Sequence, residues 1–168
     1  MTTKKSGSRG TRARRPRAAS RGRAKSARAG AGPAEVRSPA APLPVGPYSQ
    51  AVAYGALLFL SGQIPLDPTT QKLVAGEIEE QTVRVIENLA AVLAVGGSSL
   101  AGVVRTTVYL TDLALFPRMN AVYARYFEQV PRPARATIQA AALPLGAQIE
   151  IDAIAVRGRK AASHSLLR

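Results

Sequence analysis

The stretch EIEEQTVRVIENLAAVLAVGGSSLAGVVRTTVYLT, residues 77–111, changes its hydrophobic period part-way along. The first part carries apolar residues every three or four positions, which predicts an amphipathic helix over Glu77–Val95. Glutamates in its first turn suit the positive end of the helix dipole, and Gly96-Gly97 suits the helix end. The second part is β-branched and alternating, which predicts a half-buried strand over Val103–Thr111.

Similar patterns continue on both sides of this stretch. Upstream, the apolar segments Val52–Tyr54 and Leu57–Ser61 flank a Gly55-Ala56 turn and predict a β-hairpin. Downstream, Pro117 suits the first turn of a second helix, whose apolar residues again recur at helical spacing.

Two further strands are predicted near the C-terminus, over Ala136–Ala141 and Ile149–Val156. The resulting order, β-β-α-β-α-β-β, indicates an α+β domain in which two helices cover one face of a mixed sheet. Two helices cannot cover both faces of the sheet, so the other face is either solvated or buried in an oligomer. Because the strands are apolar, we expect it to be buried between subunits.

Basic residues are concentrated at the N-terminus. The net charge is +13, and residues 1–40 hold 12 of the 23 Lys and Arg beside a single acid, Glu35. Residues 41–168 hold 11 basic and nine acidic residues, so the remainder is nearly neutral. Since residues 1–30 contain no Leu, Ile, Val, Phe, Tyr or Trp, we expect residues 1–40 to be a disordered basic tail and linker. We assign residues 41–160 to one domain and residues 161–168 to a C-terminal tail.

The basic tail allows three interpretations. It could be a solvated extension, a tether that binds nucleic acids or other polyanions weakly through phosphates, or an organellar transit peptide. No aromatic residue is interleaved for base stacking, and no amphipathic face typical of transit peptides is present. We therefore expect a cytoplasmic protein, with organellar targeting as the alternative.

Several kinds of active site are excluded by composition. Cysteine is absent, and the single histidine, His164, lies four residues from the C-terminus. A cysteine nucleophile, a thiolate metal site and a Ser-His-Asp triad are therefore unavailable. No run of 18 apolar residues occurs, so we expect no membrane span, and we expect neither metal nor cofactor.

The segment PRPARATIQ, residues 131–139, carries an arginine, Arg135, at the start of a strand predicted to be buried. Its planar fork suits a carboxylate ligand, whereas Arg132 is expected to be a solvated loop residue. Glu150 is a candidate general base, because a carboxylate is one of the few bases available here. The hairpin predicted between the last two strands could bring Arg135 close to Glu150, either as a structural ion pair or as two parts of a site.

Other polar residues stand out in apolar surroundings. They are Tyr48 in GPYSQ, Ser61 and Gly62 in SGQIP, and Asn120 near the start of the second helix. Each has an ordinary explanation as a turn tyrosine, a strand terminator or a helix-start residue.

Taken in order, the segments GPYSQAV, FLSGQIPLDP, VVRTTVYLTDLALFPRMNAVYARYF and RPARATIQAAALPLGAQIEIDAIAV resemble the RidA/YjgF/YER057c/UK114 family of reactive-intermediate deaminases. The resemblance covers roughly residues 41–159. It implies a chorismate-mutase-like α+β fold and a homotrimer with sites between subunits. The implied reaction is hydrolysis of 2-imino acids, such as 2-iminobutanoate and 2-iminopropanoate, to 2-keto acids and ammonia.

The same resemblance implies a role for each candidate residue. Arg135 matches the carboxylate-binding arginine, and Glu150 matches the acid that positions the attacking water. The implied substrate-binding residues are Tyr48, Ser61, Gly62, Asn120, Arg135, Ala136 and Thr137, the last through its backbone.

Two other classes of function remain open. The same arginine could hold a 2-keto acid in a non-enzymatic regulatory trimer. The chain could also be RNA-associated, with a ribonuclease or translation-inhibitor role and a basic tether.

Overall fold

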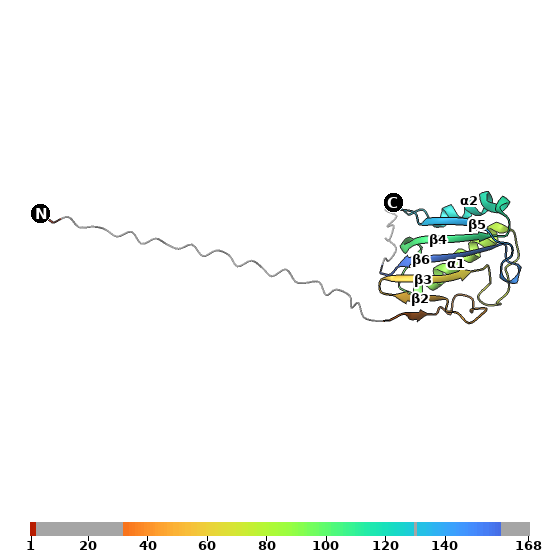
Figure 1. Ribbon diagram of the computed structural model, residues 1–168, viewed down its shortest axis with the longest axis horizontal. Coiled ribbons are helices and arrows are strands. Elements are labelled where there is room, and N and C mark those ends of the chain that lie inside the picture. The colour runs from red at the N-terminus through yellow and green to blue at the C-terminus, as the bar shows by residue number, and fades with distance from the viewer. Residues whose placement is uncertain (3–31, 130, 159–168) are drawn as a thin grey trace, which may run out of the picture.

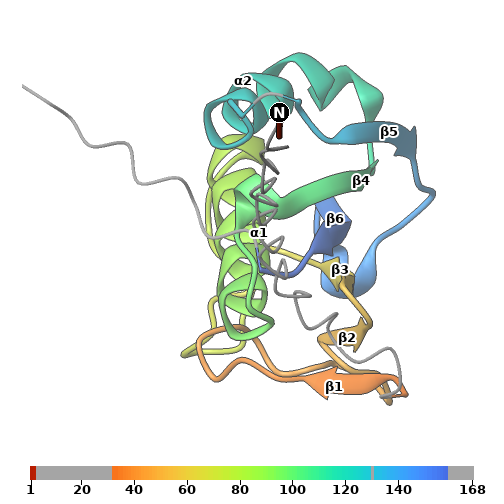
Figure 2. The same cartoon turned by 90° about the vertical axis from the view of Figure 1, so that its left-hand side faces the viewer.

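The computed structural model describes residues 1–2, 32–129 and 131–158, so most of the expected disordered tail and the C-terminal tail at residues 161–168 lie outside the described residues. The described residues form a six-stranded sheet of order β1-β2-β3-β6-β4-β5 (Figure 1). Both helices lie on one side of the sheet (Figure 2), which confirms the predicted α+β arrangement. The elements are β1 Ala34–Val36, β2 Ala51–Tyr54, β3 Leu57–Gln63, α1 Ile78–Val95, β4 Val103–Leu110, α2 Phe116–Tyr126, β5 Ala134–Gln139 and β6 Ile149–Val156.

Helix α1 follows the prediction closely. The backbone N–H of Glu77 donates to Glu80 Oε2 at 3.0 Å, so the helix start is capped by its own first-turn acid. At its other end Gly97 has φ +78°, a conformation that favours glycine. The apolar stripe is fully buried against the sheet, including Val85, Ile86, Leu89, Val92 and Leu93.

Strand β6 is the centre of the sheet and shows strict alternation. Ile149, Ile151, Ala153 and Ala155 are buried on the helix side, and the residues between them are half-buried on the other side. The predicted bounds of this strand are confirmed. Its neighbours, β3 and β4, are both antiparallel to it.

The first strand was not predicted. Residues 34–36, assigned to the linker, form β1 and pair antiparallel with β2 in the register Ala34↔Ala53. This stretch is only three residues long, too short to show a hydrophobic period, and its backbone hydrogen bonds to β2 leave no pattern in the sequence. The chain beyond it is held by the buried Gln50, which accepts from Ser38 N and donates to Pro42 O at 2.7 Å.

The expected hairpin between the last two strands is wrong. Strand β5 pairs parallel with β4, and β4 separates it from β6. The connection from β4 through α2 to β5 is a β-α-β crossover, which demands a parallel neighbour and leaves β6 on the far side of β4. Strand β5 also begins and ends two residues earlier than expected, and none of its six residues is buried.

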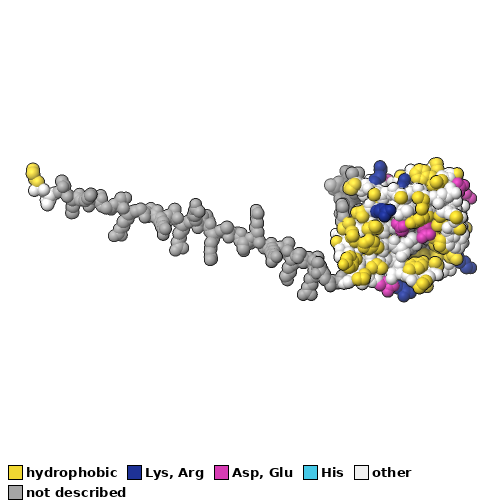
Figure 3. Space-filling view, in the orientation of Figure 1, with side chains coloured by type: hydrophobic (Ala, Val, Ile, Leu, Met, Phe, Trp, Pro, Cys, Tyr) yellow, Lys and Arg dark blue, Asp and Glu magenta, His cyan; other side chains and the backbone are white. Residues whose placement is uncertain are grey.

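The open face of the sheet remains rich in hydrophobic side chains. Tyr54, Leu57, Phe59 and Ile138 are 59%, 37%, 42% and 47% exposed. Figure 3 views this face and shows hydrophobic side chains gathered around a few acidic and basic ones. Burial of this face between subunits stays a prediction.

Candidate functional site

Arg135 lies on β5 and faces α2. Its Nη2 donates to Asn120 Oδ1 at 2.8 Å. Its guanidinium carbon lies 4.5 Å from the ring centroid of Tyr123 and 5.5 Å from that of Phe116. The cation is therefore held against two aromatic faces and one neutral amide oxygen, an arrangement that orients the guanidinium without neutralising it.

The aromatic support of Arg135 is itself fixed by the core. Tyr123 is buried, and its hydroxyl shares a 2.8 Å hydrogen bond with Thr106, the β4 residue in register with Arg135. Its ring stacks on Phe127 with the centroids 4.3 Å apart. Burial is the main cause that raises the pKa of Tyr123, so the phenol stays neutral.

The guanidinium of Arg135 keeps unused capacity for hydrogen bonds. Among the described residues no carboxylate forms an ion pair with it, and a single N–H donates to a side chain. Because an arginine has five N–H donors, most of the fork remains available to an anion.

The backbone beside Arg135 lies at an open sheet edge. Ala140 N donates to Leu110 O at 2.8 Å, so the even-numbered residues of this segment turn their N–H groups toward β4. By alternation, the N–H groups of Arg135 and Thr137 point away from β4, out of the sheet edge. The side chain of Ala136, between them, lies on the open face.

A second group of candidate residues surrounds Glu150 at β3. A Cβ built on Gly62 would overlap the Glu150 carboxyl group, with 2.7 Å to Cδ and 2.9 Å to Cγ. A side chain at position 62 would therefore displace the glutamate carboxyl group, which lies directly across the β3 backbone. The register between β3 and β6 shifts between Leu60 and Gln63, at this same point.

Ser61, which precedes Gly62, and Tyr48, from the loop before β2, both form hydrogen bonds with backbone groups. Ser61 Oγ donates to Ser49 O at 2.7 Å. Tyr48 accepts from Val45 N at 3.2 Å and is 44% exposed. Tyr48 and Gly62 also line the same small pocket, with Pro42, Leu43 and Gln63 among its walls.

Glu150 is suited to proton exchange. Its pKa is raised, first because the carboxyl is partly buried and second because Asp152 carries a negative charge nearby. In the described part of the chain, no hydrogen bond ends on its carboxylate. An uncompensated, partly buried carboxyl group is a feature typical of general acids and bases.

Within one chain, Arg135 and Glu150 do not meet. Arg135 faces the helix layer, whereas Glu150 lies on the open face, two strands away across β4. Strand spacing alone puts their backbones about 10 Å apart across the sheet. The structural ion pair considered from the sequence is therefore wrong for the single chain, and the candidate residues fall into two groups.

Comparison with known proteins now adds to this geometry. Residues 38–157 match the family model described as Endoribonuclease L-PSP. The chain belongs to the RidA/YjgF, or endoribonuclease L-PSP, family. This confirms the resemblance that the four sequence segments indicated.

Individual members of the RidA/YjgF family are similar over most of their length. Protein DfrA of Myxococcus xanthus is 56% identical over 123 residues, which cover 72% of this chain and 93% of that protein. The chloroplastic Reactive Intermediate Deaminase A of Arabidopsis thaliana is 49% identical over 115 residues, 68% of this chain and 61% of that one. The crystal structure of Escherichia coli TdcF with bound serine has 37% identity and a TM-score of 0.71, and covers 74% of this chain and 98% of its own.

Two negative findings complete this description of the RidA/YjgF member. Over residues 1–2, 32–129 and 131–158, no helix has the length and hydropathy needed to cross a bilayer. The same residues contain no group of three or more acidic, histidine or cysteine side chains placed to hold a metal ion.

Sequence reasoning missed the aromatic support of Arg135. The helical pattern marks Tyr123 and Phe116 only as apolar residues of α2 and gives neither a role beside Arg135. Asn120, expected in the first turn, lies in the second turn of α2. The signal was nevertheless present, because Phe116, Asn120 and Tyr123 are four and three residues apart and share one helix face.

Proposed function

We propose that this chain hydrolyses reactive 2-imino acids, of the 2-iminopropanoate and 2-iminobutanoate kind, to 2-keto acids and ammonia. The observation that carries the proposal is the guanidinium of Arg135, oriented by Tyr123 and Asn120 with donors to spare for a carboxylate. Two relatives support it: one is named a reactive intermediate deaminase, and another holds serine, which also bears an α-carboxylate.

The proposed active site is shared between two subunits of a homotrimer. Arg135, Asn120 and Thr137 of one chain would face Tyr48, Gly62 and Glu150 of the next. Two facts support this arrangement: the two groups are separated within one chain, and the open sheet face is apolar. A closed ring of three copies would bring each Arg135 group to a Glu150 group.

In the proposed reaction Glu150 moves one proton twice. Its carboxylate accepts a proton from water as the water oxygen bonds to C2 of the protonated imine, giving a carbinolamine. Glu150 then returns this proton to the amino nitrogen, the C–N bond breaks, and the hydroxyl proton leaves with ammonia. Iminium and water thus become 2-keto acid and ammonium, and the binding of substrate and water in attacking geometry supplies much of the rate.

The remaining residues would shape the pocket. The backbone N–H of Thr137 lies at the open edge of β5 and is a candidate donor to the developing carbinol oxygen. Tyr48 would close the pocket from the neighbouring subunit, with Ser61 holding the chain beneath it. Ala136 is small, so substrate or a neighbouring chain can approach the β5 backbone closely.

The test is a coupled assay of 2-keto acid formation from 2-iminopropanoate generated in situ. Wild-type protein should accelerate product formation, whereas Arg135→Ala and Glu150→Gln should each be nearly inactive. Trimers that contain both variants, co-expressed with two different tags and purified on both, should recover about a third of the wild-type rate, because each such trimer would contain one intact site of three. If these trimers stay inactive, the site is not shared in this way.

A binding protein is the first alternative. The bound serine of the Escherichia coli structure favours recognition of small amino acids or their keto acids without requiring turnover. Calorimetric titration with a 2-keto acid separates the two functions. In an enzyme, Glu150→Gln should abolish turnover and leave binding largely intact, whereas a pure sensor should show no turnover in either protein.

An RNA-associated role is the second alternative, favoured by the name of the matching family, Endoribonuclease L-PSP. Full-length protein incubated with a structured RNA should then cleave it, and Arg135→Ala should reduce cleavage if the same cleft is used. RNA binding that is lost at raised salt, without any cleavage, would indicate that the basic residues 1–40 bind the RNA phosphates.

For location we propose the cytoplasm. One relative is chloroplastic, so organellar targeting by residues 1–40 is the alternative. A fluorescent reporter carrying these residues should remain cytoplasmic, and uptake into an organelle would overturn the proposal.

A further inference from the structure

A second carboxylate lies beside Glu150 on the open face of the sheet. Asp152 follows two residues along β6 and therefore points to the same side. The hydroxyl of Tyr109 on β4 donates to Asp152 Oδ2 at 2.9 Å. Tyr109 is in register with Glu150, while Thr107 is in register with Asp152, so the phenol reaches diagonally from one acid to the other.

The surroundings of Glu150 in the chain are therefore defined on three sides. On β3 it meets Gly62, which has no side chain, and no titratable residue of β3 faces it. On β4 its register partner is Tyr109, and the charged Arg105 lies further along the same face, opposite Ile154. On its own strand it meets Asp152. The helices and Arg135 lie on the other face of the sheet.

The hydrogen bond of Tyr109 goes to Asp152 and not to Glu150. It is the main cause that raises the pKa of Tyr109, so the phenol stays protonated and remains a donor. Asp152 thus has a fixed donor, whereas the Glu150 carboxylate accepts no hydrogen bond from the described residues. One acid of the pair is anchored, and the other is left to exchange protons.

We propose that Tyr109 and Asp152 are positioning residues for Glu150: the phenol anchors the Asp152 carboxylate, and this fixed negative charge keeps the Glu150 carboxyl group over Gly62 and ready to exchange a proton. The inference rests on the proposed function, in which Glu150 accepts a proton from water and returns it to nitrogen. A carboxyl group serves both steps best when its proton affinity lies close to the working pH. Burial and the neighbouring charge of Asp152 both act in that direction.

The alternative is that Tyr109 and Asp152 only join two strands. A merely structural pair would affect folding without changing the pH profile of the reaction. The test therefore compares kcat/KM against pH for wild type and Asp152→Asn, a change that keeps the size and the acceptor for Tyr109 but removes the charge. We expect the acidic limb of Asp152→Asn to move to lower pH and its plateau rate to fall about tenfold, with KM unchanged.

Two further variants separate action through Glu150 from general damage. Tyr109→Phe keeps the ring and should lower kcat severalfold without raising KM. In a Glu150→Gln background, neither Tyr109→Phe nor Asp152→Asn should lower the residual rate further, because both act through Glu150. Glu128→Gln, which removes an exposed carboxylate at the end of α2, should leave rate and pH profile unchanged.

A measurement without turnover keeps the inference testable if a variant is inactive. The side-chain carboxyl carbon of Glu150, followed by NMR against pH, should titrate at lower pH in Asp152→Asn than in wild type. An unshifted titration and an unshifted acidic limb would overturn the role of Asp152. Full activity of Glu150→Gln would instead overturn the proposed function itself, so the two failures are distinguishable.

Discussion

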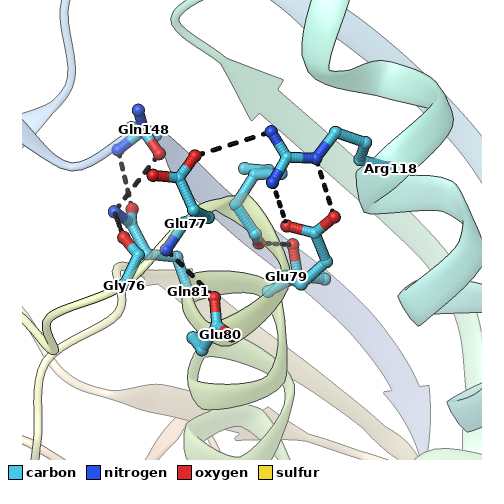
Figure 4. A network of polar contacts seen from close by, with 9 residues as sticks. Gly76, Glu77, Glu79, Glu80, Gln81, Arg118 and Gln148 are labelled. Atoms are coloured by element: carbon cyan, nitrogen blue, oxygen red, sulfur yellow. Dashed lines mark hydrogen bonds and ion pairs between the residues drawn. The ribbon is translucent and has the colours of Figure 1, made fainter.

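Two arginines near α2 have opposite environments. Arg118 donates from Nε and Nη2 to both oxygens of Glu79 at 2.7 Å, and Glu77 lies 3.5 Å away (Figure 4). Arg135 donates to one neutral amide and otherwise contacts aromatic faces. The first guanidinium is paired with two carboxylates and links α2 to the start of α1, while the second has no carboxylate partner among the described residues and keeps most of its donors. Free hydrogen-bonding capacity, more than residue type, distinguishes a binding arginine from a structural one.

The two glutamates of these regions differ in the same way. The hydrogen bond from Arg118 is the main cause that lowers the pKa of Glu79, so it is a permanent counter-ion. Partial burial is the main cause that raises the pKa of Glu150, so it can gain and lose a proton. A paired acid stabilises a fixed charge, and an unpaired, partly buried acid is available for chemistry.

The largest effect is expected from the replacement of Arg135, with Arg118 as its control. Arg135→Ala should lower kcat/KM for 2-iminopropanoate about 100- to 1,000-fold, because two charge-assisted hydrogen bonds to the carboxylate are lost. Arg135→Lys should recover only part of this, since it keeps the charge without the planar fork. The matched control, Arg118→Ala, should leave kcat/KM unchanged and lower the melting temperature slightly. Equal losses for both alanine variants would remove the distinction between the arginines.

A methyl group added at Gly62 should have the second largest effect. Gly62→Ala would push the Glu150 carboxyl group from its place, and a displacement of about 1 Å can cost about 100-fold in rate. The matched control is Gly32→Ala, because a Cβ at Gly32 would meet no atom within 4 Å. Steady-state kinetics should show the loss in kcat for Gly62→Ala alone. An active Gly62→Ala enzyme would show that Glu150 does not act from this position.

The aromatic support of Arg135 should have a moderate effect. Phe116→Leu keeps an apolar side chain but removes one cation–π contact, worth about 0.5–1 kcal/mol at an exposed site, so KM should rise about two- to fivefold. Melting curves on the same protein should show a nearly unchanged fold. A fall in kcat with KM unaltered would mean that Phe116 does not act through the carboxylate-binding arginine.

The smallest effects are expected in the pH dependence of stability, where the two glutamates should have opposite signs. Because the pKa of Glu150 is raised in the folded protein, its contribution to the free energy of unfolding declines as the pH rises from the ordinary glutamate pKa to the raised one. Glu150→Gln should remove this decline. Because the pKa of Glu79 is lowered in the folded protein, its contribution to the free energy of unfolding declines as the pH falls below the ordinary glutamate pKa. Glu79→Gln should remove this second decline. Melting temperatures between pH 3 and 8 would measure both, and slopes of the same sign would contradict the comparison.

The sequence predicted local structure well wherever the hydrophobic period was long. Helix α1 and strand β6 have the predicted bounds within a residue, because a buried stripe or an alternating face repeats several times in each. Strand β1 was not predicted, because it has only three residues and is held by backbone hydrogen bonds to β2, which leave no pattern in the sequence. Candidate site residues could be chosen from the sequence by motif and by residue chemistry, but Tyr123, Tyr109 and Asp152 were not chosen, since each also has an ordinary place in a helix or strand.

By itself, the sequence determined the type and order of the main elements, the concentration of basic residues in the first 40 positions, and the selection of Arg135 and Glu150. These properties follow from local periods and from the chemistry of single side chains. Only the tertiary structure decided that β4 lies between β5 and β6, and that Arg135 and Glu150 occupy opposite faces of the sheet. Strand order and facing depend on pairing between distant segments and on the crossover through α2, and no local pattern encodes either one.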